Sequence, residues 1–390
     1  MHRYLIQFDG NGSESFNNSI PAVKFGRVGK QRLTLESYDH YDLEHSVKSQ
    51  LFHIPEIPES REPWPIGGVD TGRFEYTAEG FVSSWSLDDS AVKGTVVPHN
   101  AFHIWVDNGR SVQACTLQRE SRSGIWPQTV PMPAVAYRFP IGLRRYIVEG
   151  WPIDLETIAF SPILPGHPTP SCLPIWVYRI GVANRSESPM KMSVLLTWTF
   201  ATESNISQGD FDIQHDNLCF SAILRDGRND NRMVIALPDI HHRERAWQGA
   251  EPWDPDTESD AIWEDFAEDG EIESRWVSSD RQAAALWVKF ELDAYEVRNF
   301  QFFVTWHFPM RCEKDGRLVD RQYMRYPTKR RPDNAVVWLA EQARLNNEEW
   351  LKQISDWLNP AISYPDLPSY KERVEMMQAL YQEIQAGRNT

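Results

Sequence analysis

Acidic side chains are the most abundant groups in this sequence that could do chemistry. The chain has 55 Asp and Glu residues against 40 Lys and Arg residues, and the acids are densest between Glu251 and Glu273. Within that run, four acids occupy alternate positions: Asp254, Asp256, Glu258 and Asp260. This spacing could place several carboxylate oxygens around a calcium ion, which prefers such ligands.

Two neighbouring residues argue against calcium. Ser259 stands where a calcium-binding loop needs glycine, and Asp265 stands where a bidentate Glu is expected. The favoured interpretation is a solvated acidic insertion that closes as a helix over Ile262, Trp263 and Phe266. Because the sequence also lacks phosphate-loop, dinucleotide and zinc spacings, it predicts no metal and no cofactor.

Paired carboxylates are a second possibility, because two of them suffice for glycoside hydrolysis when they flank the scissile bond. The sequence nominates no such pair, since acids on strands and loops are most often solvated surface groups. A sandwich that catalyses with its own carboxylates therefore stays open as an alternative.

Tryptophan offers another kind of chemistry, because the indole face can pack against the C–H groups of a sugar. The chain has 16 Trp residues. Four lie beside polar or Pro-rich turns and are the candidate sugar-contact residues: Trp64, Trp85, Trp151 and Trp176. Packing in the core is the more common role of each, since Trp buries a large apolar area.

The stretch from Trp64 to Arg73 contains Gly67, Gly68 and Gly72, and it leads into an alternating strand pattern. Glycines allow backbone conformations that other residues avoid, so this stretch predicts a tight loop that enters a strand. We call residues 66–73 the glycine loop. Its charged residues, Asp70 and Arg73, are further candidates for contact with a sugar or with another domain.

The elements that must position these residues are mostly strands. Short stretches rich in Val, Ile, Trp, Phe and Thr recur between turn residues, and Asp107-Asn108-Gly109 has the composition of a hairpin turn. The predicted strands are 102–106, 146–148, 155–160, 175–183, 192–200, 217–224, 233–237, 283–292 and 297–306. This pattern predicts a mainly β fold, a large antiparallel two-sheet β-sandwich or supersandwich.

Sustained helical spacing appears near the C-terminal end. Apolar residues at three- and four-residue spacings follow Asp333, and Pro360 should end that helix. A second helix is expected over residues 370–386. We therefore expect an irregular extension with edge strands (1–60), a sandwich (61–331) and a helical connector (332–390) whose helices contact another domain.

Composition excludes several classes of protein. The net charge of −15 argues against a nucleic-acid partner. No apolar run is long enough to span a bilayer, and the N-terminus lacks the apolar core of a signal peptide. The four Cys residues have no metal or redox spacing, so the sequence favours a cytoplasmic protein with reduced thiols.

Several ordered blocks resemble the N-terminal domain of glycoside hydrolase family 116, the family of the non-lysosomal glucosylceramidases or bile-acid β-glucosidases. The resemblance covers roughly residues 60–390. Its blocks are Ile66–Gly72 with Gly80 and Trp85, Tyr146–Trp151, Phe160–Pro165, Leu173–Tyr178 with Ala183-Asn184, Trp263–Gly270, Phe303–Pro309, and Asp366–Lys371 through Ala379–Tyr381. Asp70, Arg73 and Glu75 depart from it, because the family has small residues there.

This resemblance implies a non-catalytic sandwich that packs on an (α/α)₆ catalytic barrel, in the same chain or a separate one, and shapes the rim of its sugar site. The family's Glu nucleophile and Asp acid/base belong to that barrel, so no catalytic residue is expected here. The expected partners are the barrel and a glucoside or glycolipid. The alternative is a stand-alone carbohydrate- or glycolipid-binding protein that uses exposed Trp side chains.

Overall fold

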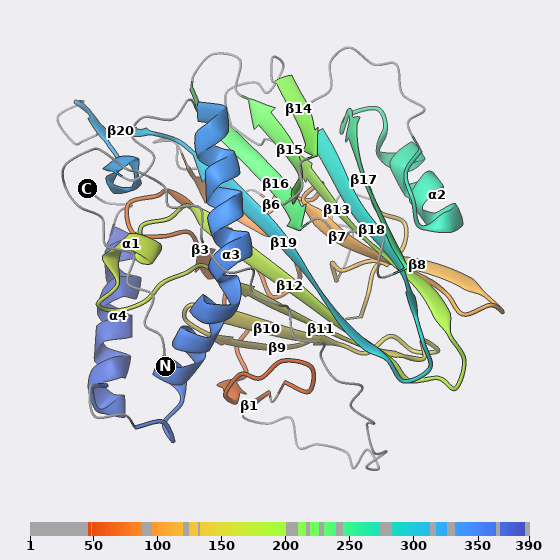
Figure 1. Cartoon of the computed structure of the whole chain (residues 1–390), viewed down its shortest axis with the longest axis horizontal. Helices are drawn as coiled ribbons and strands as arrows, with labels where there is room; N and C mark the ends of the chain where they lie inside the picture. Colours follow the sequence, from red (N-terminus) through yellow and green to blue (C-terminus); the bar gives the residue numbers. More distant parts are fainter. Residues whose placement is uncertain are drawn as a thin grey trace, which may run out of the picture. The chain divides into compact units, whose positions relative to one another are not determined.

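Two sheets face each other at the centre of the fold, and helices cover their outer faces (Figure 1). The structure is a computed structural model that describes residues 46–47, 49–87, 96–119, 125–131, 133–199, 210–215, 219–225, 230–238, 245–273, 283–312, 317–325, 332–363 and 367–386. These residues belong to a unit that spans residues 37–390. Residues 1–45 and 48 of the expected extension lie outside the described residues, as do residues 364–366 and 387–390 of the expected connector.

The larger sheet is antiparallel throughout. Its described strands are, in spatial order, β14 (Asp210–His215), β15 (Cys219–Arg225), β16 (Arg232–Pro238), β19 (Val297–His307), β12 (Ile175–Asn184), β11 (Ile153–Phe160), β10 (Ile141–Tyr146) and β9 (Ala134–Arg138). Every residue of β12 is buried. Both faces of this strand are therefore covered, which explains its nearly continuous apolar sequence.

The smaller sheet is also antiparallel. Its described strands are, in order, β17 (Ala246–Trp253), β18 (Ala283–Leu292), β13 (Met190–Thr199), β7 (Ala101–Asp107) and β8 (Val112–Thr116). The predicted hairpin at Asn108-Gly109 joins β7 to β8, and Gly109 has a φ of 76°. Of the Asn-Gly pair, Gly109 alone has a positive φ, which glycine adopts without strain.

Shorter strands surround the two sheets. They are β1 (Ser46–Val47), β2 (Ile57–Pro58), β3 (Trp64–Ile66), β4 (Arg73–Tyr76), β5 (Val82–Ser86), β6 (Val96–Val97), β20 (Met310–Cys312) and β21 (Leu318–Asp320). β3 to β6 form one small sheet, β1 pairs with β2, and β20 pairs with β21. The glycine loop connects β3 to β4, so its two ends are fixed by strand pairing.

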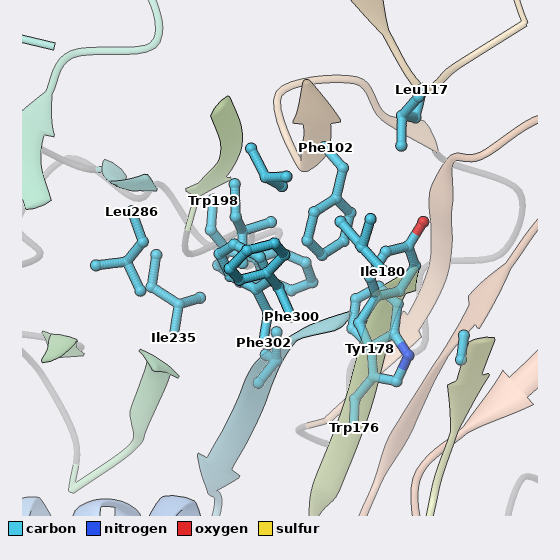
Figure 2. Close-up of a cluster of buried hydrophobic side chains, with 14 of the residues drawn as sticks. Phe102, Leu117, Trp176, Tyr178, Ile180, Trp198, Ile235, Leu286, Phe300 and Phe302 are labelled. Atoms are coloured by element: carbon cyan, nitrogen blue, oxygen red, sulfur yellow. The ribbon is translucent and has the colours of Figure 1, made fainter. Parts of the chain in front are cut away.

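The main core lies between the two large sheets and is rich in aromatic rings (Figure 2). Phe102 of β7 stacks on Tyr178 of β12, with ring centroids 3.8 Å apart. The ring centroid of Trp198 on β13 lies 5.7 Å from that of Trp176 on β12. Because facing strands of both sheets supply this core, the predicted antiparallel two-sheet β-sandwich is confirmed.

The described helices are α1 (Pro168–Ser171), α2 (Ser259–Asp269), α3 (Pro332–Leu358), α4 (Tyr370–Ala386) and the 3₁₀ helix η2 (Gln322–Arg325). None of these is both long and apolar enough to cross a membrane. α2 buries Ile262, Trp263 and Phe266 against the outer face of the smaller sheet, as the acidic insertion was expected to do.

α3 is part of the sandwich itself, because it packs on the outer face of the larger sheet (Figure 1). That the helices after residue 332 also contact another domain stays a prediction. Val336 and Leu339 join a cluster with Phe303 of β19. Since the outer face of that sheet is apolar, the sandwich needs this helix for its own core.

α4 follows α3 across a corner that an arginine holds together. Arg373 is 2% exposed, and its guanidinium donates hydrogen bonds to the carbonyls of Asp356 and Trp357 in the last turn of α3 and to those of Asn359 and Ile362 just after it. The last carbonyls of a helix have no partner within it, so these bonds satisfy them. A residue of α4 therefore holds the turn between α3 and α4 in place.

Candidate functional site

The glycine loop is the candidate site to which the sequence first points. Gly67 and Gly72 have φ values of 135° and 73°, and Asp70 has a φ of 57°. Glycine adopts such angles without strain, and Asp adopts them more readily than most residues. The chain therefore turns sharply between β3 and β4 and brings Asp70 and Arg73 close to distant parts of the sequence.

Backbone amides of the glycine loop bind within the domain. Gly67 donates its N–H to Ser161 Oγ (2.9 Å), Gly68 to Thr71 Oγ1 (2.8 Å), and Val69 to the carbonyl of Ser171 (2.7 Å). A loop that cradles phosphate must keep such amides available for the anion. This loop is therefore a scaffold turn.

Close packing fixes two of the glycines as well. A Cβ at Gly67 would lie 2.5 Å from the carbonyl oxygen of Gly72. A Cβ at Gly68 would lie 2.5 Å from the carbonyl oxygen of Ser171, at the end of α1. Both neighbours are backbone atoms, so any side chain at these positions would displace the chain.

Asp70 joins the glycine loop to two later segments. Its Oδ1 lies 3.3 Å from Nε of Arg311 on β20, and its Oδ2 accepts a hydrogen bond of 2.8 Å from the backbone N–H of Gln322 in η2. The carboxylate thus anchors the base of the β20–β21 hairpin. Sequence reasoning singled out Asp70 but could not name partners so far along the chain.

Arg73 has the same kind of role toward α4. Its side chain is buried, and Nη1 donates a hydrogen bond of 3.1 Å to the carbonyl of Ile384. A cation at the C-terminal end of a helix interacts favourably with the unpaired carbonyls and the helix dipole. Asp70 and Arg73 therefore gather the glycine loop, the β20–β21 hairpin, η2 and the last turn of α4. We call these four segments the loop end.

A buried thiol lies at the loop end. Cys172 follows α1, and its Sγ contacts Oε1 of Gln322 at 3.4 Å. Burial, together with the negative charges of Asp70 and Glu383, raises the pKa of this thiol to about 11. The thiol is therefore protonated at neutral pH and is a poor nucleophile.

The four candidate tryptophans are core residues to different degrees. Trp64, Trp85 and Trp176 are at most 5% exposed. Trp151 is half-buried and packs against the same core. Only an accessible indole face can receive a sugar, so Trp64, Trp85 and Trp176 fit the core interpretation instead.

Trp64 also lies in an arrangement that sequence reasoning missed. The buried guanidinium of Arg144 lies over the rings of Tyr76 (3.8 Å) and Trp64 (4.7 Å) and donates a hydrogen bond to the carbonyl of Thr77. Aromatic faces stabilise a desolvated cation. No local signal in the sequence marks Arg144, because its partners come from β3 and β4.

The four alternating acids do not surround a common point. Glu258 Oε2 accepts the backbone N–H of Asp254 (2.7 Å), and Asp254 Oδ1 accepts that of Asp256 (2.9 Å). Asp260 lies in the first turn of α2. Within the described part of the chain, no three His, Cys, Asp or Glu residues are arranged to hold a metal ion. The carboxylates of Asp254 and Glu258 instead order the turn that leads into α2.

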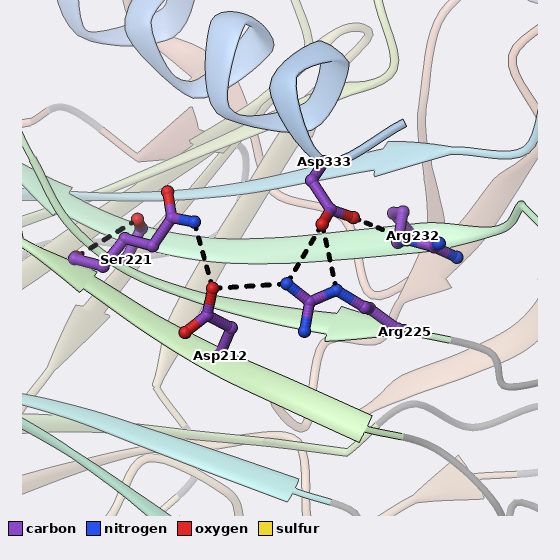
Figure 3. Close-up of polar contacts among 6 residues, drawn as sticks. Asp212, Ser221, Arg225, Arg232 and Asp333 are labelled. Carbon is purple, nitrogen blue, oxygen red and sulfur yellow. Dashed lines mark hydrogen bonds and ion pairs between the residues drawn. The ribbon is translucent and has the colours of Figure 1, made fainter. Parts of the chain in front are cut away.

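A charged network at the start of α3 also escaped sequence reasoning (Figure 3). Asp333 accepts hydrogen bonds from Nε of Arg225 on β15 (3.1 Å) and Nε of Arg232 on β16 (2.7 Å). Asp212 of β14 lies 3.2 Å from Nη2 of Arg225. Burial alone would raise the pKa of Asp333, but the two arginines outweigh it and lower that pKa. The network fixes the N-terminal end of α3 on the larger sheet.

Comparison with known proteins gives this architecture a family. Residues 64–350 match the family described as "beta-glucosidase 2, glycosyl-hydrolase family 116 N-term". The match runs from β3 through the sandwich into α3, and so includes the glycine loop. It confirms the family resemblance that the sequence blocks indicate.

Two solved structures show distant similarity. A putative kojibiose phosphorylase from the human microbiome shares 9% identity at a TM-score of 0.37, covering 85% of this chain and 36% of that one. A polysaccharide lyase shares 12% identity at a TM-score of 0.29, covering 66% of this chain and 34% of that one. This chain thus spans about a third of the length of each. By the match over residues 64–350, the chain belongs to the N-terminal domains of glycosyl hydrolase family 116.

Proposed function

We propose that this chain is the non-catalytic sandwich of a β-glucosidase and that it packs on an (α/α)₆ catalytic domain, in the same polypeptide or a separate one. The family match over residues 64–350 is the observation that carries the proposal. The sandwich would shape the rim of the active site. The retaining Glu and Asp pair would come from the catalytic domain.

The loop end is the surface that we propose for this contact. On the β20–β21 hairpin, Met310, Cys312, Leu318 and Asp320 share one face. Met310 is 39% exposed and Leu318 is 61% exposed. Exposed apolar side chains such as these two are typical of a contact with another protein or domain. Asp70 supports the proposal because it holds the base of this hairpin.

We also propose a substrate class and a cellular location. The substrate would be a β-glucoside, either a free glucoside or a glycolipid such as glucosylceramide. A cytoplasmic location is supported by Cys115 and Cys172, which form no disulfide, as is usual in a reducing compartment.

The experiment compares the chain alone with the chain joined to, or mixed with, an (α/α)₆ catalytic domain of the family. The chain alone should not hydrolyse p-nitrophenyl β-D-glucopyranoside, and the pair should form a complex that does. Leu318→Glu should weaken that complex about tenfold or more, because it places a charge in an apolar contact.

Leu345→Glu is the matched control, because Leu345 is 55% exposed and belongs to α3, which is not among the segments of the loop end. This variant should leave the complex unchanged. Turnover by the chain alone would contradict the non-catalytic role. A complex that tolerates Leu318→Glu and Met310→Glu would show that the hairpin is not the contact surface.

A further inference from the structure

A buried arginine lies in the main core of the sandwich without a carboxylate beside it. Arg144 of β10 is 1% exposed. Its neighbour Arg145 points to the opposite face of the strand, where its Nε lies 3.8 Å from Oε1 of Glu156. The buried Arg179 pairs with Glu348 at 2.8 Å. Arg144 forms no such ion pair with any residue that the structure describes.

The positive charge of Arg144 is permanent, because a guanidinium stays protonated in proteins. Buried charges are normally paired, since an isolated ion loses its hydration without replacement. The ring faces of Tyr76 and Trp64 stabilise the guanidinium in part. These rings carry no net negative charge, so one positive charge in the core has no counter-ion among the described residues.

Hydrogen-bond donors without acceptors surround this charge. Nη2 of Arg144 donates to the carbonyl of Thr77, whereas Nε and Nη1 are buried and have no partner. Nε1 of Trp64 is also buried and has no partner. A Cβ at Gly142 would lie 2.8 Å from this Nε1, so the indole N–H lies over the face of β10 that carries Arg144. Unpartnered N–H groups of two buried residues therefore lie in the same part of the core.

Tyrosine hydroxyls lie in this part of the core as well. The hydroxyl of Tyr76 donates a hydrogen bond of 3.3 Å to that of Tyr178. The Tyr146 hydroxyl lies beside Tyr178 and Arg144. Burial raises the pKa values of Tyr146 and Tyr178, so neither phenol supplies a negative charge at neutral pH. We call Arg144, Trp64, Tyr76, Tyr146 and Tyr178 the arginine cluster.

An anion suits the arginine cluster better than a water molecule does. Water accepts hydrogen bonds but brings two hydrogens of its own, which need acceptors in turn. Water also leaves the charge of Arg144 uncompensated. An anion only accepts hydrogen bonds, and its charge balances that of the guanidinium. The positive edges of aromatic rings favour a negative ion further.

We propose that the arginine cluster binds one small monovalent anion, chloride, at the unpartnered N–H groups of Arg144 and Trp64. A polyatomic anion such as phosphate carries more charge and needs more donors than these residues provide. The bound ion links β3, β4 and β10, because Trp64, Tyr76 and Arg144 come from these strands. No substrate and no catalytic domain takes part, so the site is independent of the proposed function.

Thermal unfolding in two salts is the first test. The protein is unfolded in urea and refolded in about 200 mM sodium chloride or sodium gluconate, so that a trapped ion is exchanged. Chloride should raise the melting temperature by about 2–4 °C over gluconate, and the rise should saturate, because only the folded state holds the ion. Equal melting temperatures in the two salts would contradict the site.

Three variants separate the site from general effects of salt. Trp64→Phe keeps a ring but removes Nε1, so the chloride concentration that gives half of the stabilisation should rise about fivefold, as for one lost hydrogen bond. Arg144→Met should abolish the response to chloride. Trp105→Phe is the matched control, because Trp105 is also buried with an unpartnered Nε1 but lies on the outer face of the smaller sheet. Its response should equal that of the wild type, and an equal response of Trp64→Phe would overturn the proposal.

Bromide locates the ion without any variant, because it replaces chloride and gives an anomalous X-ray signal. Crystals of wild-type protein refolded in sodium bromide should show an anomalous peak in contact with Arg144 and Trp64. A water molecule at this position, or bromide peaks at the protein surface only, would overturn the proposal. This result stands even where Arg144→Met fails to fold.

Discussion

The guanidinium of Arg73 donates a hydrogen bond to the carbonyl of Ile384, a residue 311 positions later in the chain. Arg73 is the first residue of β4, and Ile384 lies in the last turn of α4. This bond, together with those of Asp70, ties the glycine loop to the C-terminal part of the unit. The charged residues that depart from the family pattern thus have structural partners within this chain.

Replacement of Arg73 should loosen the end of α4. In Arg73→Met the carbonyl of Ile384 loses its donor, and we expect amide hydrogen exchange in the last turn of α4 to become about fivefold to tenfold faster, the equivalent of about 1 kcal/mol. Exchange measured by mass spectrometry would show this. Arg110→Met, in the exposed turn between β7 and β8, should leave α4 unchanged.

Removal of the charge at Asp333 should weaken the attachment of α3. Asp333→Asn loses two charge-assisted hydrogen bonds, so urea denaturation should show a loss of about 1–2 kcal/mol in the free energy of unfolding. Asp356→Asn is the control, because Asp356 pairs with Lys352 on the exposed face of α3. It should cost less than about 0.5 kcal/mol, and equal losses would contradict the proposed role of the network.

Two buried histidines should make the fold sensitive to acid. Burial lowers the pKa of His103 from 6.5 to about 3, and burial with the charge of Arg232 lowers that of His307 to about 4. Between these values and 6.5, the unfolded chain binds protons that the folded chain does not, so stability falls as the pH falls. Each histidine should cost about 2 kcal/mol between pH 7 and pH 5.

Urea denaturation from pH 7.5 to pH 4.5 would measure this dependence. The imidazole of His103 contacts the hydroxyls of Thr116 and Thr197, at 2.9 Å and 3.0 Å. His103→Gln keeps a polar side chain but no longer titrates, so its stability should fall less steeply with acid than that of the wild type. An unchanged slope would exclude His103 as a source of the dependence.

Two glycines should differ sharply in their tolerance of a methyl group. Gly68→Ala drives a Cβ against the backbone of Ser171 and should cost about 2–3 kcal/mol. Gly150→Ala meets nothing within 4 Å and bears only the strain of its φ of 80°, which costs about 1 kcal/mol. Thermal unfolding of the two variants would rank them, and the reverse order would contradict the packing of the glycine loop.

The strands that sequence reasoning located well are those with continuous apolar or alternating patterns. β18 was predicted with its observed bounds, and β19 was predicted to within one residue. The prediction for residues 146–148 was wrong, because β10 ends at Tyr146. β17 was missed, since Gly249 and Pro252 interrupt its pattern. An edge strand tolerates both residues because one side of its backbone has no partner strand.

The candidate site was harder to predict because its contacts are distant in sequence. Trp85 and Trp176 stand beside turn residues, yet their rings meet Phe74 and Trp198 from other strands. Local composition cannot show that a second sheet will cover a side chain. The exposed Trp247 was not singled out either, because its strand, β17, was not predicted.

The position of β19 has a consequence for how the chain folds during synthesis. β19 lies between β16 and β12, although it follows both in the sequence. Until residue 307 has left the ribosome, β12 and β16 must wait as the open edges of two separate half-sheets. While residues 185–307 are synthesised, the nascent chain therefore carries an open edge on β12, and β16 adds a second open edge once residue 238 has been made.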